Sequence, residues 1–197
     1  MSDREPKQDR SRATRARLLE ATVECLAKHG WSATTVAVVA ERAGVSRGAA
    51  QHHFPVREDL ITAALEMMFE VRSGEAIAEM STLPTGPGRT EAVVVGLVDY
   101  YVSPLFKAAL QVWTAAAADP ALRARIVPLE AKFGRQVHRM AVAALAVDDT
   151  DPTAHHLVQA TLDLARGLAL ADVLTDDSER REKVVLAWAQ TVEQALR

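Results

Sequence analysis

Residues 35–54 are predicted to form two short helices joined by a tight turn. The segment contains two capping residues and a glycine, and a proline follows it. The segment reads TVAVVAERAGVSRGAAQHHF, in which Thr35 and Ser46 are placed to cap the starts of the two helices. Gly44 can supply the positive φ that a turn of three or four residues requires, and Pro55 prevents the second helix from continuing. This spacing predicts a helix-turn-helix, whose second helix fits into the major groove of DNA.

Helical periodicity continues through nearly all of the remaining sequence, and no segment needs the strict alternation of a strand. A first helix is predicted from about Arg12 to Lys28, stopped at Gly30, and a long helix from Arg57 to about Met80. After a loop rich in proline and glycine, further helices are expected near residues 90–102, 104–118, 120–127, 128–147, 153–174 and 178–196, the last two as an antiparallel hairpin. The predicted fold class is all-α, with an amino-terminal three-helix domain followed by a larger helical domain.

The charge balance is asymmetric along the chain. The net charge is -3, but residues 1–60 carry 10 lysines and arginines against 8 acidic residues, whereas residues 61–197 carry 13 against 18. The excess of positive charge therefore falls on the segment predicted to touch DNA. A basic lead-in precedes that segment, either to follow the phosphate backbone or to act as a solvated tail, and it contains Arg4, Lys7, Arg10, Arg12, Arg15 and Arg17.

Cys25 is the only cysteine, so an intrachain disulfide and a zinc site built from cysteines are both excluded. Cys25 is predicted to be a buried thiol. No apolar run is long enough for a membrane span, and the first thirty residues lack the pattern of a signal peptide. We therefore expect a cytoplasmic protein that has no membrane partner.

The predicted recognition helix begins with groups that can bind phosphate oxygens, namely Ser46, Arg47 and the backbone amides beside them. Gln51 and His52 follow where they could reach base edges, and glutamine can pair bidentately with adenine. Gly48 leaves room for close approach of the backbone. The full set of predicted DNA-contacting residues is Thr35, Ser46, Arg47, Gly48, Ala49, Gln51, His52 and Arg57.

Residues Leu18–Leu65, with GWSATTVAVVAERAGVSRGAAQHHFPVREDL at their centre, resemble the amino-terminal domain of the TetR/AcrR family of transcriptional regulators. The resemblance implies a regulator with a flexible basic arm at 1–11, a DNA-binding domain at 12–56, and an effector-binding and dimerisation domain at 57–197. It also departs from the family at two positions. The family usually has a tyrosine where Gln51 stands and a small capping residue where Val56 stands, so Gln51 either replaces the tyrosine at phosphate or reads bases.

After residue 80 the resemblance extends only to architecture, and it implies an effector cavity among the helices. Arg166, three residues after Asp163, either forms an ion pair within its helix or orients an acidic effector. The candidate ligand-binding residues are Met68, Tyr101, Phe106, Trp113, Phe133, Met140 and Arg166.

The last two helices each retain apolar residues beyond those that a core needs, and pairing with a second copy would give a four-helix bundle. A homodimer with two-fold symmetry places two recognition helices about one DNA turn apart, which predicts a near-palindromic operator. The predicted dimer-interface residues are Leu157, Leu164, Leu168, Val185, Trp188 and Val192.

Neither a catalytic motif nor a cofactor motif is present, so no enzyme activity and no cofactor are expected. His138, His155 and His156 do not have the i, i+4 spacing of a helical metal site, and no metal site is predicted. The resemblance favours a repressor that a small-molecule effector releases from its operator. An activator on the same fold, or a helical carrier or enzyme with a vestigial DNA-binding domain, are the alternatives.

Overall fold

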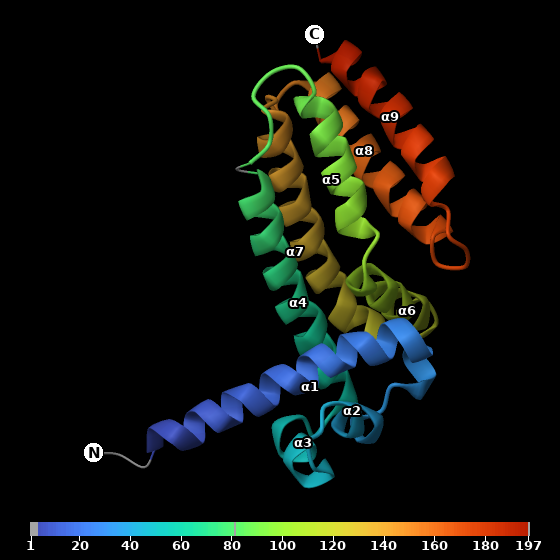
Figure 1. Cartoon of the computed structure of the whole chain (residues 1–197). Helices are drawn as coiled ribbons and strands as arrows, with labels where there is room; N and C mark the ends of the chain where they lie inside the picture. Colours follow the sequence, from blue (N-terminus) through green and yellow to red (C-terminus); the bar gives the residue numbers. More distant parts are fainter. Residues whose placement is uncertain (1–3, 81, 197) are drawn as a thin grey trace. The chain divides into compact units, whose positions relative to one another are not determined.

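The structure, a computed structural model, describes residues 4–80 and 82–196, and side chains from residue 8 onward. Within those ranges all regular elements are helices and there is no strand, as predicted (Figure 1). The helices are α1 Arg4–Ala33, α2 Val36–Arg42, α3 Arg47–His53, α4 Arg57–Met80, α5 Arg89–Tyr101, α6 Pro104–Ala118, α7 Pro120–Leu145, α8 Pro152–Ala171 and α9 Ser178–Ala195. None of these helices is by itself long and apolar enough to cross a membrane; α5 and α6 reach that threshold only when they are counted together, by length and composition alone.

Helix boundaries in the amino-terminal region follow local signals in the sequence. α2 and α3 begin directly after Thr35 and Ser46, and α4 has the predicted bounds. The main helix of α1 is interrupted at Gly30, whose φ of 78° and ψ of 179° are open essentially only to glycine. The predicted stop at Gly30 is therefore confirmed.

The arm predicted to be flexible over residues 1–11 is instead helical from Arg4 onward, while residues 1–3 lie outside the described residues. Charged side chains of this segment pair along the helix, since Arg12 Nη2 lies 2.6 Å from Asp9 Oδ1. Farther along, Thr14 Oγ1 donates to the Arg10 carbonyl at 2.8 Å. The described part of the arm is therefore helical, and its flexibility stays a prediction.

Pro128 does not separate two helices, so the predicted boundary between residues 127 and 128 is also wrong. α7 continues through this proline from Pro120 to Leu145. A proline removes one backbone hydrogen bond, but the apolar stripe of the helix does not change phase there. Buried residues recur at helical spacing on both sides of Pro128, at Leu122, Ile126, Val137, Met140 and Ala144.

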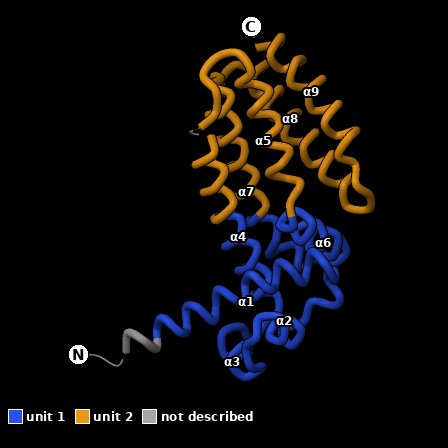
Figure 2. The backbone as a smooth tube through the Cα atoms, viewed as in Figure 1, with its two compact units in different colours: residues 1–70, 104–129 blue, residues 71–103, 130–197 orange. Residues whose placement is uncertain are grey.

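Two compact units make up the chain, and their bounds differ from the predicted domain boundaries (Figure 2). Unit 1 contains Met1–Glu70 and Pro104–Leu129, and unit 2 contains Val71–Ser103 and Glu130–Arg197. The helix-turn-helix segment thus shares a unit with α6 and with parts of α4 and α7.

In unit 1 the core lies between α1 and the helices that pack on it. Leu18, Leu19 and Leu26 of α1 are fully buried, and α6 packs against α1 with Ala108 and Val112 equally buried. Val39, Ala50 and Phe54 join the same core, and so does Cys25, the predicted buried thiol, which is 2% exposed. Burial raises the pKa of the Cys25 thiol, which therefore stays protonated and unreactive.

In unit 2, α5, α8 and α9 pack side by side, and α8 and α9 form the predicted hairpin (Figure 1). An ion pair of 2.7 Å between Arg181 and Asp172 closes the connection between the two helices. Leu168, Val185 and Val192 are 4%, 4% and 0% exposed within the single chain. These side chains are therefore buried inside unit 2, which leaves little of their surface for the predicted contact with a second copy.

Candidate nucleic-acid interface and effector pocket

The helix-turn-helix is fixed by bonds that its own sequence supplies. Thr35 Oγ1 accepts from the Val38 amide at 3.2 Å at the start of α2, and Ser46 Oγ accepts from the Ala49 amide at 3.2 Å at the start of α3. Because Thr35 and the Ala49 amide are engaged in these caps, both serve first to hold the two helices in place.

The turn between the helices depends on Gly44, which has φ of 63°. This conformation brings the Val45 amide to the Ala40 carbonyl at 2.9 Å, and the Gly44 amide to the Glu41 carbonyl at 3.1 Å. Outside the turn, Arg42 pairs with Glu24 of α1 at 2.6 Å. The angle between α2 and α3 is therefore set by backbone bonds across the turn and by packing on α1.

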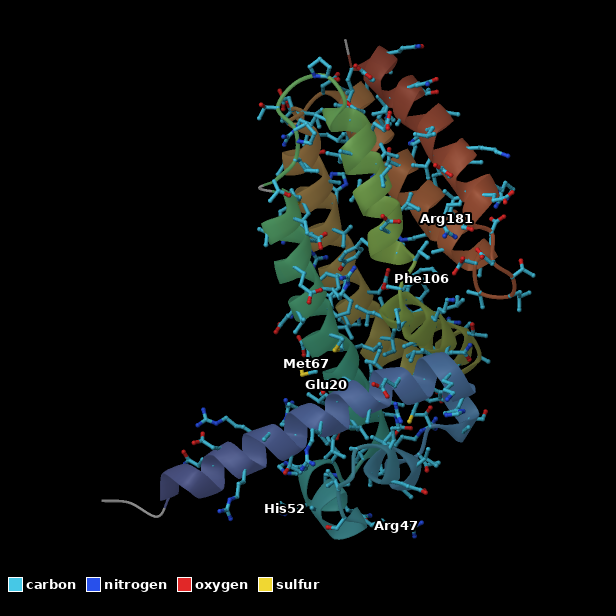
Figure 3. The ribbon with its side chains drawn as sticks, viewed as in Figure 1. Glu20, Arg47, His52, Met67, Phe106 and Arg181 are labelled. Carbon is cyan, nitrogen blue, oxygen red and sulfur yellow. The ribbon has the colours of Figure 1, made fainter. Side chains whose placement is uncertain are left out.

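One face of α3 is open to solvent and carries four of the eight predicted DNA-contacting residues. Arg47, Gly48, Gln51 and His52 are all exposed, and their spacing of i, i+1, i+4 and i+5 places them on a single face of the helix. Ala50, on the opposite face, is 1% exposed. Figure 3 shows Arg47 and His52 projecting from α3 away from the other helices of unit 1.

Arg57 has a different role from the predicted phosphate contact. Its Nε donates to the Thr34 carbonyl at 2.6 Å, and its Nη2 donates to the Trp31 carbonyl. The guanidinium also lies over the Trp31 ring, and desolvation lowers the pKa of Arg57 from its ordinary value. Arg57 therefore ties the start of α4 to the end of α1 and positions the helix-turn-helix without needing to touch DNA.

The predicted effector residues fall into both units. In unit 1, Met68 is half-buried and the ring of Phe106 meets the ring of Trp113 edge to face, with centroids 5.7 Å apart. In unit 2, Arg166 pairs with Asp163 at 2.6 Å, which is the predicted ion pair, and lies 5.4 Å from the centroid of Tyr101. Burial raises the pKa of Tyr101 to about 12, so its hydroxyl stays neutral.

Two of the predicted ligand-binding residues line separate cavities in unit 2. Met140 lines an apolar pocket of about 90 Å³, together with Leu97, Tyr100 and Val137. Arg166 lines a more polar groove of about 560 Å³ between α7 and α8. Neither lining includes Tyr101 or Phe133.

Sequence reasoning missed a polar group at the edge of the apolar pocket. Ser73 Oγ and the Tyr100 hydroxyl lie 3.4 Å apart, and the Arg72 guanidinium lies 5.8 Å from the centroid of the Tyr100 ring. Arg72 Nε is buried without a hydrogen-bond partner. Val93, Leu97 and Tyr100 recur at helical spacing along α5, and that stripe was the available signal.

Comparison with known proteins gives a consistent result. The family model for bacterial regulatory proteins of the tetR family matches residues 18–64. The HTH-type transcriptional regulator CymR of Pseudomonas putida is 28% identical over 185 residues, covering 89% of this chain and 87% of CymR. The HTH-type transcriptional regulator BetI of Escherichia coli is 30% identical over 121 residues, covering 59% of this chain and 62% of BetI.

Solved structures share the fold over nearly the whole chain. A transcriptional regulator from Rhodococcus sp. Rha1 superposes with a TM-score of 0.68 at 22% identity, covering 92% of this chain and 95% of that one. The multidrug binding protein EbrR, solved with ethidium, superposes with a TM-score of 0.59 at 22% identity, covering 89% of this chain and 98% of EbrR.

Proposed function

Because the chain belongs to the TetR family of bacterial regulators and is a DNA-binding transcriptional regulator, we propose that it is a repressor that a small-molecule effector releases from a near-palindromic operator. It acts in the cytoplasm by binding alone, without catalysis. The observation that carries the DNA-binding part is the exposed face of α3, opposite the buried Ala50.

Four residues on or beside that face contact the operator. Ser46 and Arg47 donate to phosphate oxygens, and these contacts set the register of the helix on the duplex. Gln51 and His52 lie one turn farther along and reach base edges in the major groove. Arg57 supports the interface from within unit 1.

A homodimer presents two recognition helices, one from each copy, to the two half-sites of the operator. Of the predicted interface residues, Leu157, Leu164 and Trp188 are only half-buried within the chain and remain available to a partner. Trp188 is held by a hydrogen bond of 2.9 Å from its Nε1 to Thr161 Oγ1. These three side chains form the proposed contact between copies.

The effector enters the apolar pocket of unit 2 beside Tyr100. An apolar wall with a hydroxyl pair at its edge suits a small, mostly apolar molecule that carries one polar group. The pocket measures about 90 Å³, below the roughly 300 to 1,000 Å³ of ordinary ligand sites. Binding must therefore widen the pocket, and that requirement gives the effector unequal affinities for two conformations.

Selection of bound sites from random DNA by the full chain tests the regulator. We expect two half-sites in near-palindromic order, and an affinity that falls steeply as salt is raised. Arg47→Ala should weaken binding to all sequences, whereas Arg135→Ala, an exposed arginine on α7, should not. Failure to bind any DNA in a salt-sensitive manner would overturn the proposal.

Filling the pocket tests release by an effector. Gly96 lines the pocket and has open space where a Cβ would stand, so Gly96→Leu should block an effector found by a release screen and leave operator binding intact. Gly74→Leu, at an exposed helical glycine outside the pocket wall, is the matched control. An effector that tightens operator binding, or transcription that rises with the operator placed upstream, would replace the repressor by an activator.

A further inference from the structure

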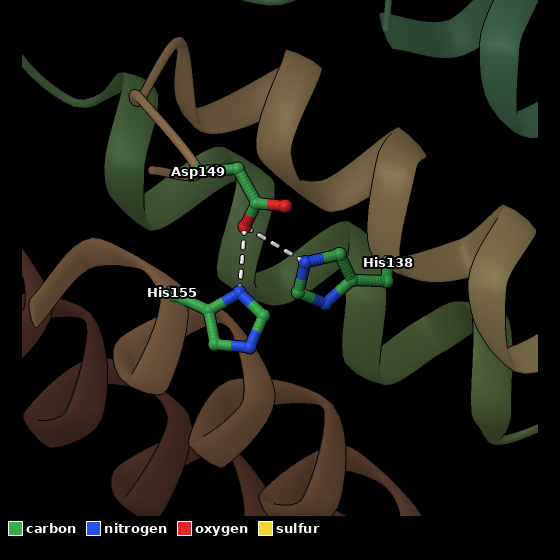
Figure 4. A group of neighbouring side chains, drawn as sticks. All are labelled: His138, Asp149 and His155. Atoms are coloured by element: carbon green, nitrogen blue, oxygen red, sulfur yellow. Dashed lines mark hydrogen bonds and ion pairs between the residues drawn. The ribbon is translucent and has the colours of Figure 1, made fainter. Parts of the chain in front are cut away.

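Three side chains from α7, α8 and the loop between them meet in unit 2. Asp149 Oδ1 lies 2.9 Å from His138 Nε2 and 3.0 Å from His155 Nδ1, so one carboxylate oxygen accepts from both imidazoles (Figure 4). The two ring centroids are 5.0 Å apart. Each of the three side chains offers one potential ligand atom, and these atoms lie within 4.8 Å of one another.

The loop that carries Asp149 is ordered by bonds of its neighbours. Asp148 Oδ1 accepts from the amide and hydroxyl of Thr150 at 2.9 and 2.8 Å. Asp151 caps α8 by accepting from the Ala154 amide at 3.0 Å. With the carboxylates on either side engaged in the loop and the helix cap, Asp149 is the one presented to the two histidines.

The group is open to ions from solvent. The side chains of His138, Asp149 and His155 are 18%, 41% and 37% exposed, and all three line the groove of about 560 Å³. Hydrogen bonds from the two histidines hold the pKa of Asp149 below its ordinary value, so this carboxylate is anionic at neutral pH.

We propose that His138 Nε2, Asp149 Oδ1 and His155 Nδ1 bind one divalent transition-metal ion of the zinc class. Two imidazoles and a carboxylate suit zinc, cobalt or nickel, whereas calcium and magnesium prefer oxygen ligands alone. Ligands at about 2.0 to 2.2 Å from a tetrahedral ion lie roughly 3.3 Å from one another, so small side-chain movements convert the present geometry into a ligand set. The fourth position faces the groove and takes water.

Binding exchanges protons for the ion. In the arrangement without metal, His138 Nε2 and His155 Nδ1 carry the hydrogens that point at Asp149. Each ring must present a lone pair to the ion, so each hydrogen moves to the other ring nitrogen or leaves to solvent. No redox step is involved, and the ion replaces two hydrogen bonds by three coordinate bonds.

Arginines in the same groove limit which ions can compete. Arg135, Arg139 and Arg166 also line it, and only Arg166 has a described ion pair, with Asp163. Their positive charge opposes weakly held cations, so binding depends on coordinate bonds to imidazole rather than on charge alone. The site should therefore discriminate strongly against magnesium.

Titration of the full chain with cobalt chloride, followed by displacement with zinc chloride, tests this inference without DNA or effector, and so independently of the proposed function. We expect one ion per chain and visible absorption typical of low-coordinate cobalt, which zinc abolishes. His155→Gln and Asp149→Asn should each weaken binding by at least about tenfold. His156→Gln, at the exposed neighbouring histidine, should leave it unchanged.

Thermal unfolding of each variant without metal verifies that it is folded. Zinc should raise the midpoint of the unmodified chain and of His156→Gln, and should not raise that of His155→Gln. Absence of binding by the unmodified chain, or equal binding by His155→Gln and His156→Gln, would overturn the site.

Discussion

The guanidinium of Arg57 lies 4.1 Å from the centroid of the Trp31 ring, where it also reaches the carbonyls that end α1. Arg57, which the sequence predicts to contact phosphate, thus helps to hold the helix-turn-helix in place. The planar guanidinium stacks on the Trp31 ring and donates to both carbonyls at once, which the ammonium group of a lysine cannot do.

Arg57→Ala should lower the free energy of unfolding by about 1–3 kcal/mol, because it removes the donor to the part-buried Thr34 carbonyl and the contact with the Trp31 ring. Arg57→Lys should recover only part of that loss. Chemical denaturation followed by circular dichroism measures both. A variant as stable as the unmodified chain would show that Arg57 is available to DNA after all.

Substitutions at Gly44 and Gly48 distinguish an effect on folding from an effect on DNA binding. Gly44→Ala should cost about 1–2 kcal/mol, because an alanine at a φ of 63° is strained even with open space around it. Gly48→Ala should not destabilise the chain, since Gly48 is helical and open, yet it should weaken operator binding if the backbone of α3 approaches DNA closely. Unfolding and operator titration of both variants give the comparison.

Gln51→Ala should relax the preference at one operator position by about 1–3 kcal/mol, as expected for loss of a bidentate contact to adenine. Gln194→Ala, at an exposed position on α9, is the matched control. Competition among operators that differ at single positions measures the effect. Uniform weakening across all sequences would instead place Gln51 at a phosphate.

Glu130 should make stability depend on pH. Burial raises its pKa above the ordinary value despite the attraction of Arg166, so the charged form costs stability in the folded state. Glu130→Gln should therefore raise the unfolding midpoint at pH 7, and the gain should disappear as the pH falls below about 4, where folded and unfolded states are both protonated. Glu182→Gln on α9 controls for the substitution itself.

Leu164→Glu should shift the protein from dimer to monomer, because it would place a charge in the proposed contact between copies. Leu174→Glu, at a side chain that is 90% exposed just beyond α8, is the control. Sedimentation at micromolar concentration distinguishes the two forms. If the unmodified chain is itself a monomer there, the dimer proposal is wrong.

The sequence predicts the helix-turn-helix well because its bounds depend on local chemistry. Thr35, Ser46 and Gly44 each act within a few residues of themselves, by capping or by adopting a positive φ. The role of Arg57 could not be found in the same way, because its partners lie more than twenty residues earlier and come close only in the folded chain.

The apolar faces of the last two helices show the same limit. Helical spacing identifies Leu164, Leu168 and Val192 as apolar positions, but the packing of α5 decides which of them are core. The histidine and aspartate group was missed because His138, Asp149 and His155 come from two helices and a loop, with no repeating interval between them.

The single buried cysteine makes the chain convenient for distance measurements. Because Cys25 is 2% exposed and its thiol stays protonated, a spin label or fluorophore would react almost only with a cysteine introduced at position 51 in place of Gln51. In a dimer such a label would report the separation of the two recognition helices directly, with and without effector, and Cys25 would not have to be removed first.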